Sequence, residues 1–163
     1  MLQFYEMKNR LITDYLALLL VIAVFIFFTL SCNSSYSMKR VIFTKEAPAP
    51  IGPYSQAIAA NGMIYVSGQI AIDPATNELL SSGDIQTETH QVMKNLDAIL
   101  QAAGSSMDKV VKCSIFLSDM NNFAAVNEVY GTYFTNEPPA RETVEVSKLP
   151  KGVRVEISAI ALQ

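Results

Sequence analysis

The sequence predicts an α/β domain of the α+β type, with two helices packed on one face of a mixed six-stranded sheet. Three observations lead to this prediction. Six short runs are rich in β-branched and aromatic residues, and two longer runs repeat apolar residues three and four positions apart. Asn61-Gly62 separates two of the strand-like runs, as in a hairpin. The elements follow one another in the order βββαβαββ within residues 38–163.

The first three strands are predicted from short β-forming runs. The run at 41–44 precedes a proline-rich loop at 46–53, in which proline favours extended backbone. The runs at 55–60 and 63–69 flank Asn61-Gly62, a dipeptide that favours a two-residue β-turn. We therefore expect a hairpin here, followed by a turn-rich stretch at 73–83.

The two helices are predicted from apolar spacing. Asp84 is a favourable N-cap and Gly104 a favourable C-terminal residue. Between them the apolar residues recur at helical spacing: Val92, Met93, Leu96, Ile99, Leu100 and Ala103. A second helix is expected at 121–134, from Phe123, Val126, Tyr130 and Tyr133. The remaining strands are predicted at 110–117, 141–146 and 153–162.

One face of this sheet is expected to remain uncovered, because two helices cover only one side of it. The last strand alternates between an apolar file and a mixed one. The apolar file is Val153, Val155, Ile157, Ala159 and Ala161, and the opposite file is Arg154, Glu156, Ser158, Ile160 and Leu162. A half-apolar face of this kind usually packs against another subunit, so we expect a homo-oligomer.

Composition excludes several classes of site. The formal net charge is −3 and no basic stripe is visible, so no nucleic-acid partner is expected. Two cysteines and one histidine cannot build a Cys/His zinc site. The chain also has no Gly-rich phosphate loop of the Walker or dinucleotide kind. We therefore expect a site that works without a metal and without a nucleotide.

Residues 1–37 read as an N-terminal hydrophobic segment followed by a polar linker. Lys8 and Arg10 precede an apolar-rich run at 16–30, which is short for a membrane span and suits a signal-peptide core. The run ends at Cys32 in a sequence similar to a lipoprotein cleavage box, so Cys32 is the candidate lipidation residue. We expect an exported or membrane-anchored, lipoprotein-like protein if residues 1–37 are translated, and a cytoplasmic one if translation starts at Met38.

Two C-terminal runs carry a candidate site. Arg141 follows Pro138-Pro139, where we expect the backbone to stay outside the strand ladder and the guanidinium to project into a cleft. A guanidinium there would bind a small carboxylic acid through two parallel hydrogen bonds. Glu156 lies mid-strand, where partial burial would keep it basic and able to handle water. The two runs could lie side by side; the alternative is an ordinary surface Arg–Glu pair.

Five segments carry a resemblance to a known family. They are 49–57, 65–69, 122–130, 139–141 and 149–157. In this order and spacing, residues 38–163 resemble the reactive intermediate deaminase (Rid) family, and its RidA subgroup most closely. The resemblance implies a chorismate-mutase-like fold and a homotrimer with clefts between subunits. It also implies hydrolysis of reactive 2-imino or enamine acids, such as 2-iminobutanoate and 2-iminopropanoate, to 2-keto acids and ammonia, with no cofactor.

The resemblance also assigns roles to individual residues. The family's carboxylate-binding arginine falls on Arg141, and its water-handling glutamate on Glu156. The substrate-binding positions fall on Tyr54, Ser67, Gly68, Asn127 and Thr143, the last of which is cysteine in some relatives. We expect Gly68, which has no side chain, to let the substrate approach closely.

Two other functions compete with deamination. Some relatives are called endoribonucleases or translation inhibitors, an activity that would require a basic groove. The same clefts could instead bind a carboxylate metabolite without catalysis, as in relatives that lack the arginine.

Overall fold

The computed structural model describes residues 10, 15–22, 39–80 and 83–163, and the chain clusters into two units, Met1–Tyr36 and Ser37–Gln163. In the first unit, residues 15–22 are helical and every side chain is exposed. Within the described residues, no helix has the length and hydrophobicity that a membrane crossing requires. Cys32 lies outside the described residues.

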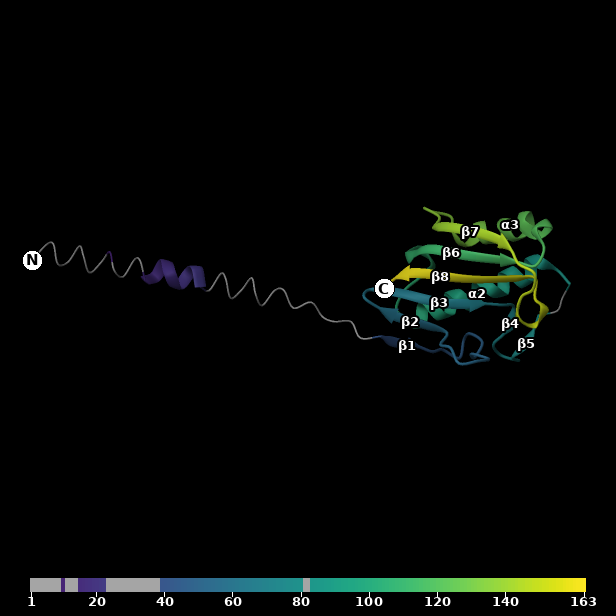
Figure 1. Ribbon diagram of the computed structural model, residues 1–163, viewed down its shortest axis with the longest axis horizontal. Helices are drawn as coiled ribbons and strands as arrows, with labels where there is room; N and C mark the ends of the chain where they lie inside the picture. The colour runs from purple at the N-terminus through teal and green to yellow at the C-terminus, as the bar shows by residue number, and fades with distance from the viewer. Residues whose placement is uncertain (1–9, 11–14, 23–38, 81–82) are drawn as a thin grey trace, which may run out of the picture. The chain divides into compact units, whose positions relative to one another are not determined.

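The second unit contains the predicted six-stranded mixed sheet (Figure 1). Its strands lie in the order β1-β2-β3-β8-β6-β7, and every neighbouring pair is antiparallel except β6 and β7, which are parallel. The bounds are β1 (Arg40–Ile42), β2 (Ala57–Ala60), β3 (Met63–Gln69), β6 (Val110–Leu117), β7 (Ala140–Glu145) and β8 (Val155–Leu162).

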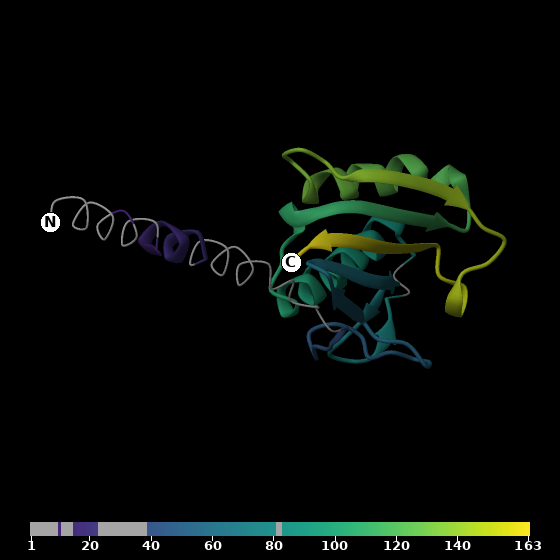
Figure 2. The same ribbon diagram turned by 60° about the vertical axis from the view of Figure 1, so that its left-hand side comes forward.

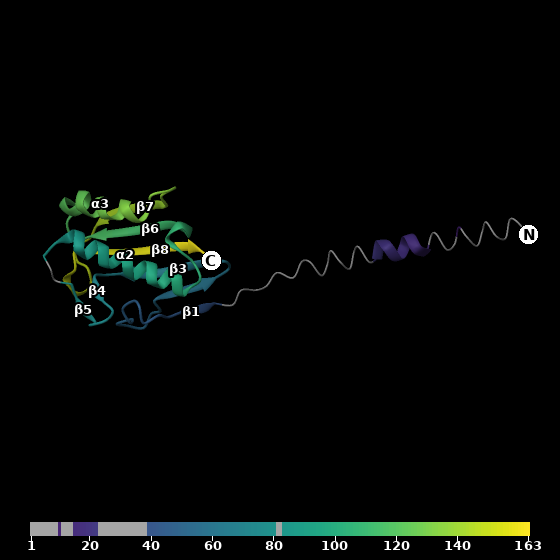
Figure 3. The same cartoon turned by 180° about the vertical axis from the view of Figure 1, so that it is seen from behind.

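Both long helices, α2 (Ile85–Ala102) and α3 (Phe123–Tyr133), cover the same face of the sheet, as the view from behind shows (Figure 3). The predicted fold class is therefore confirmed. Three short 3₁₀ turns, Met107–Lys109, Met120–Asn122 and Pro150–Gly152, connect the elements.

Local sequence explains the ends of α2. The Asp84 side chain accepts a hydrogen bond from the Gln86 backbone N–H at 2.9 Å, which satisfies one free donor of the first turn. At the other end Gly104 has φ +83°, a left-handed conformation that glycine adopts without strain. The apolar stripe predicted between these residues faces the sheet and is buried throughout.

The hairpin between β2 and β3 fixes which side chains face away from the helices. Asn61 and Gly62 both have positive φ, as a tight two-residue turn requires. The resulting register pairs Ile58 with Tyr65, and Tyr65 with Ile160 of β8. These three side chains lie on the open face, so this face carries exposed apolar surface: Tyr65 is 48% exposed, and Val41, which pairs with Ile58, is 60% exposed.

A second small hairpin, β4 (Ile72–Asp73) with β5 (Glu78–Leu79), occupies the stretch that the sequence predicted only as turns. Its two-residue strands are too short to produce a periodic signal. Ile72 packs there with Ile70, Leu149 and Val153 in a second apolar cluster, separate from the main core. This cluster supports the loop that carries Pro150.

The expected placement of the two C-terminal runs was wrong in two respects. Strand β6 lies between β7 and β8, because the α3 crossover places β7 outside β6 and the chain returns on the inner side (Figure 2). Arg141 also joins the ladder, since β7 begins at Ala140 and Arg141 pairs with Cys113. Proline removes only its own N–H donor, so pairing starts directly after Pro139.

Candidate active site

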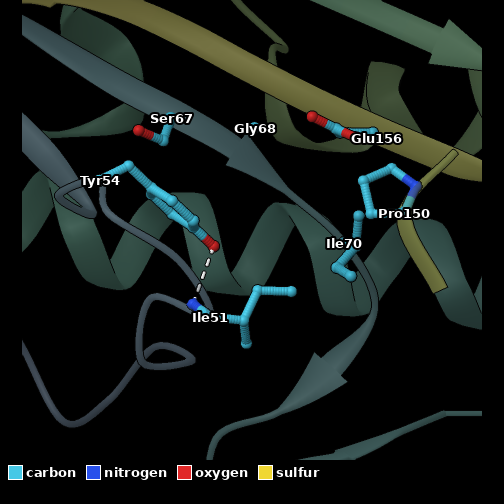
Figure 4. Close-up of a pocket in the computed structure, with 7 residues that line it drawn as sticks. All are labelled: Ile51, Tyr54, Ser67, Gly68, Ile70, Pro150 and Glu156. Atoms are coloured by element: carbon cyan, nitrogen blue, oxygen red, sulfur yellow. Dashed lines mark hydrogen bonds between the residues drawn. The ribbon is translucent and has the colours of Figure 1, made fainter.

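The first group of candidate residues surrounds a cavity on the open face of the sheet. The cavity has a volume of about 260 Å³ and is open to solvent. Four of the predicted site residues line it together with an apolar wall (Figure 4). The predicted residues are Tyr54, Ser67, Gly68 and Glu156, and the apolar wall consists of Ile51, Ile70 and Pro150.

Gly68 lies in close contact with the Glu156 side chain. The register between β3 and β8 shifts between Val66 and Gln69, so Ser67 and Gly68 form a bulge opposite β8. A Cβ atom added at Gly68 would lie 1.9 Å from Oε1 of Glu156. The space that glycine leaves is therefore used by the Glu156 carboxyl group, whereas the sequence predicted that it would admit a substrate.

Burial sets the protonation of Glu156. The carboxyl group is partly withdrawn from water between β3 and β6, and this desolvation raises its pKa above the ordinary value for glutamate. A carboxylate with a raised pKa is a stronger base than a fully solvated one. The site thus provides a group suited to accepting a proton from water.

Two polar side chains on the cavity wall are held by the loop before β2. The Tyr54 hydroxyl oxygen accepts a hydrogen bond from the Ile51 N–H at 3.2 Å, as the dashed line in Figure 4 marks. The Ser67 hydroxyl donates to the Ser55 carbonyl at 2.7 Å. Each side chain therefore has a defined direction before any ligand enters the cavity.

The second group of candidate residues surrounds the Arg141 guanidinium. Its Nη1 donates to the Asn127 Oδ1 at 2.6 Å, and its central carbon lies 4.9 Å from the ring centre of Tyr130 and 5.6 Å from that of Phe123. Two aromatic rings and an amide thus fix the guanidinium in place. Thr143, two residues further along β7, has a buried hydroxyl without a hydrogen-bond partner among the described residues.

Sequence reasoning missed Phe123 and Tyr130 as neighbours of Arg141. Their helical spacing assigned them to the core side of α3, where an aromatic residue ordinarily needs no further explanation. The available signal was that Asn127 lies four residues after Phe123 and three before Tyr130, which places all three on one helix face. Burial raises the pKa of Tyr130 and that of Cys113 beneath it, so both remain protonated at neutral pH.

The two groups lie on opposite faces of the sheet. Glu156 pairs with Phe116, whereas Arg141 pairs with Cys113, which in turn pairs with Ala159 of β8. Paired residues share a face and successive residues alternate between faces. Glu156 therefore faces away from the helices, while Arg141 and Ala159 face toward them. Within one chain, the cavity residues lie together on the open face; they are Tyr54, Ser67, Gly68 and Glu156. Arg141, Asn127 and Thr143 form a second group on the helix side of the sheet.

Comparison with known proteins identifies the family. The family model described as "Endoribonuclease L-PSP" matches residues 44–163. The chain is 49% identical over 126 residues to the mouse protein named 2-iminobutanoate/2-iminopropanoate deaminase, covering 77% of this chain and 93% of that protein. The chain belongs to this family. The resemblance to Rid proteins is thereby confirmed.

Solved structures agree with this membership. The Yersinia pestis protein YyfA, described as a member of the conserved Rid family, is 54% identical, with a TM-score of 0.75 and coverage of 77% of this chain and 99% of that one. Escherichia coli TdcF, solved with bound serine, is 39% identical, with a TM-score of 0.73 and coverage of 76% and 98%. The fold of residues 44–163 is therefore that of the family.

We predict that Glu156 lowers the stability of the folded chain at neutral pH. Because its folded pKa is raised, the folded state holds this proton more tightly than the unfolded state. The free energy of unfolding therefore falls as pH rises from the ordinary glutamate pKa, about 4.3, through the folded value. Glu156→Gln removes this loss, so the variant should exceed wild type in stability above that window, measured by urea unfolding at a series of pH values.

Glu142→Gln is a matched control with the opposite sign. Ser114 and Lys112 lower the pKa of Glu142, so its charged form favours the folded state above the ordinary glutamate pKa. That variant should be less stable than wild type at neutral pH. Parallel stability curves for wild type and Glu156→Gln across the whole range would contradict the account of Glu156.

Proposed function

We propose that the protein hydrolyses reactive 2-imino acids, such as 2-iminobutanoate and 2-iminopropanoate, to 2-keto acids and ammonia. The observation that carries the proposal is the Glu156 carboxyl group, half-buried above Gly68 with a raised pKa. Membership of a family that contains a deaminase at 49% identity supports this choice of reaction. No cofactor is required, since the imine carbon is already electrophilic.

In the proposed mechanism the substrate carboxylate binds to Arg141. A guanidinium offers several donors in one plane, and Asn127 uses one of them, which leaves others for the two carboxylate oxygens. Serine, the ligand bound in the TdcF structure, carries the same carboxylate beside a nitrogen-bearing carbon. Fixing this end of the substrate orients the imine carbon for attack, an effect that contributes several kcal/mol, up to about 7–11 in ideal cases.

Glu156 then moves the protons. Water attacks the carbon of the protonated imine (C=NH₂⁺) while Glu156 accepts one of the water protons, which leaves a hydroxyl group and a neutral amine on a tetrahedral carbon. Glu156 gives that proton to the amine nitrogen, the C–N bond breaks and ammonia leaves, and Glu156 accepts the hydroxyl proton as the carbonyl forms. General acid–base catalysis of this kind is worth about 10²–10⁴-fold. Tyr54 and Ser67 line the same cavity and would contact the substrate or the attacking water.

We further propose that the site is completed in a homotrimer. Arg141 and Glu156 face opposite sides of one sheet, so a substrate that contacts both must lie between two copies. The exposed apolar side chains of the open face, among them Tyr65, Val41 and Leu162, supply surface for that association. In this arrangement one copy contributes Glu156 with its cavity, and its neighbour contributes Arg141, Asn127 and Thr143.

We also propose that the N-terminal segment tethers the domain to a membrane. Basic residues, an apolar-rich run and Cys32 follow one another in the order of an export signal. The described helix at 15–22 exposes apolar side chains on every side, and such a surface is stable only when lipid or protein covers it. Without the segment, a start at Met38 would give the domain alone.

Arg141→Ala should lower kcat/KM for keto acid release by about 100-fold, because it removes the charge that binds the substrate carboxylate. The assay couples an amino acid dehydratase, which generates the imino acid, to detection of the keto acid. Arg40→Ala on β1 is the matched control and should behave as wild type. Unchanged deamination by Arg141→Ala would refute the mechanism, whereas RNA cleavage that survives the substitution would favour a nuclease.

Mass spectrometry of the protein purified from its native host tests the tether. We expect an N-terminus at Cys32 with a lipid mass added, recovery in the membrane fraction, and loss of both in Cys32→Ala. Recovery of a soluble protein that begins at Met38 would overturn this part of the proposal. Cys113→Ala serves as a control that retains the N-terminal cysteine.

A further inference from the structure

Two loop-rich segments form opposite walls of the cavity above Glu156. Residues 44–54 carry Ile51 and Tyr54 on one side, and residues 69–72 carry Ile70 on the other. A small hollow of about 20 Å³, lined by residues of both segments, lies next to the main cavity. Segments of this kind need partners for their buried backbone groups, since few ladder hydrogen bonds satisfy them.

A buried amide supplies those partners for the first segment. The Gln56 side chain is 1% exposed, and its Oε1 accepts from the Thr44 N–H at 2.7 Å. Its Nε2 donates to the carbonyl oxygens of Thr44 at 3.0 Å, Ala47 at 3.1 Å and Pro48 at 2.8 Å. The backbone carbonyl of Gln56 also accepts from the Ser67 N–H at 3.0 Å. One residue thus ties the loop to the bulge that holds Glu156.

A second buried amide does the same for the opposite segment. Asn95 of α2 is 1% exposed, and its Nδ2 donates to the carbonyls of Ile70 at 3.1 Å and Ile72 at 3.0 Å. Its Oδ1 accepts from the Gln91 Nε2 at 2.8 Å. The hydrogen-bonding groups of the Asn95 amide are therefore engaged, and the wall that carries Ile70 is fixed to the helix layer.

We propose that Gln56 and Asn95 are positioning residues that set the width of the cavity above Glu156, and through it the preference for the substrate side chain. Each amide holds carbonyl groups of one wall, and neither forms part of the catalytic machinery proposed above. The cavity wall includes Ile51, three residues after the Pro48 carbonyl that Gln56 binds, and Ile70, whose carbonyl Asn95 binds, so the substrate class that fits best carries a short aliphatic side chain. This inference rests on the proposed deaminase function.

The physical basis is the free energy lost when a side-chain amide that donates to buried backbone carbonyls is replaced by a group that cannot donate to all of them. A carboxylate in place of either amide has the same shape but no donor, and a carboxyl group that burial keeps protonated has only one, so at least one backbone carbonyl that the amide now binds would lose its partner. The loop must then move to reach water, and the apolar wall moves with it. One methylene group in an apolar pocket changes specificity by about 10-fold or more, so a displaced wall alters the ratio between substrates.

Gln56→Glu and Asn95→Asp test this inference in the full-length protein. We expect kcat/KM to fall about tenfold for 2-iminobutanoate and by less for 2-iminopropanoate, so the ratio between the two substrates shifts. Ile99→Val, a core substitution in α2, is the control for a general loss of stability and should leave the ratio unchanged. Equal losses for both substrates, or none, would overturn the inference.

Amide hydrogen exchange provides a readout that does not depend on activity. The Ile51 N–H donates to Tyr54, and its exchange should speed up at least tenfold in Gln56→Glu relative to Ile99→Val. Absence of keto acid release by wild type would refute the proposed function, while the exchange rate would still decide the role of Gln56. If Asn95→Asp does not fold, Gln91→Ala, which removes one donor to Asn95 at a partly buried position, should still shift the substrate ratio, and an unshifted ratio would overturn the role of Asn95. If Gln56→Glu does not fold, Gln56→Met, which keeps a similar shape without a charge, should still speed up exchange of the Ile51 N–H, and an unchanged rate would overturn the role of Gln56.

Discussion

The alternation of side chains along a strand is the constraint on which the rest of this account depends. Glu156 faces the open side of the sheet, and Arg141 faces the helix side. No side-chain rotation brings them into one cleft, because the backbone of the sheet lies between them. In the proposed function, the same alternation gives each chain two half-sites: the Glu156 carboxyl group with its cavity, and the Arg141 guanidinium with the side chains that hold it. The apolar surface of the open face provides a physical reason for the two half-sites to meet.

Each proposed half-site is held by contacts between distant parts of the chain. Gly68 on β3 leaves room for the carboxyl group of Glu156 on β8. Asn127, Phe123 and Tyr130 of α3 surround the guanidinium of Arg141 on β7. Partial burial of the Glu156 carboxylate lowers the free energy of unfolding, and burial of the apolar residues of the main core offsets this loss. The same partial burial makes Glu156 a better base.

The sequence predicted the elements better than their arrangement. Asp84, Gly104 and Asn61-Gly62 act within a few residues of themselves, so their effects could be read directly, and the alternation in β8 predicted its buried face. Strand order was not predictable in this way, because the position of β8 depends on both crossovers: α2 leaves a gap between β3 and β6, and α3 places β7 outside β6. The contact between Gly68 and Glu156 joins residues far apart in sequence. Phe123 and Tyr130 looked like ordinary core residues until Arg141 was placed against them.

A mixed-oligomer experiment tests the shared site most directly. Arg141→Ala and Glu156→Gln chains, each inactive alone, are co-expressed with different tags, and assemblies that contain both are isolated. If neighbouring copies share each site, one of the three sites in every mixed trimer combines an intact Arg141 with an intact Glu156, and activity should return to about a third of wild type. Mixed assemblies that contain both chains yet show no activity would contradict the account.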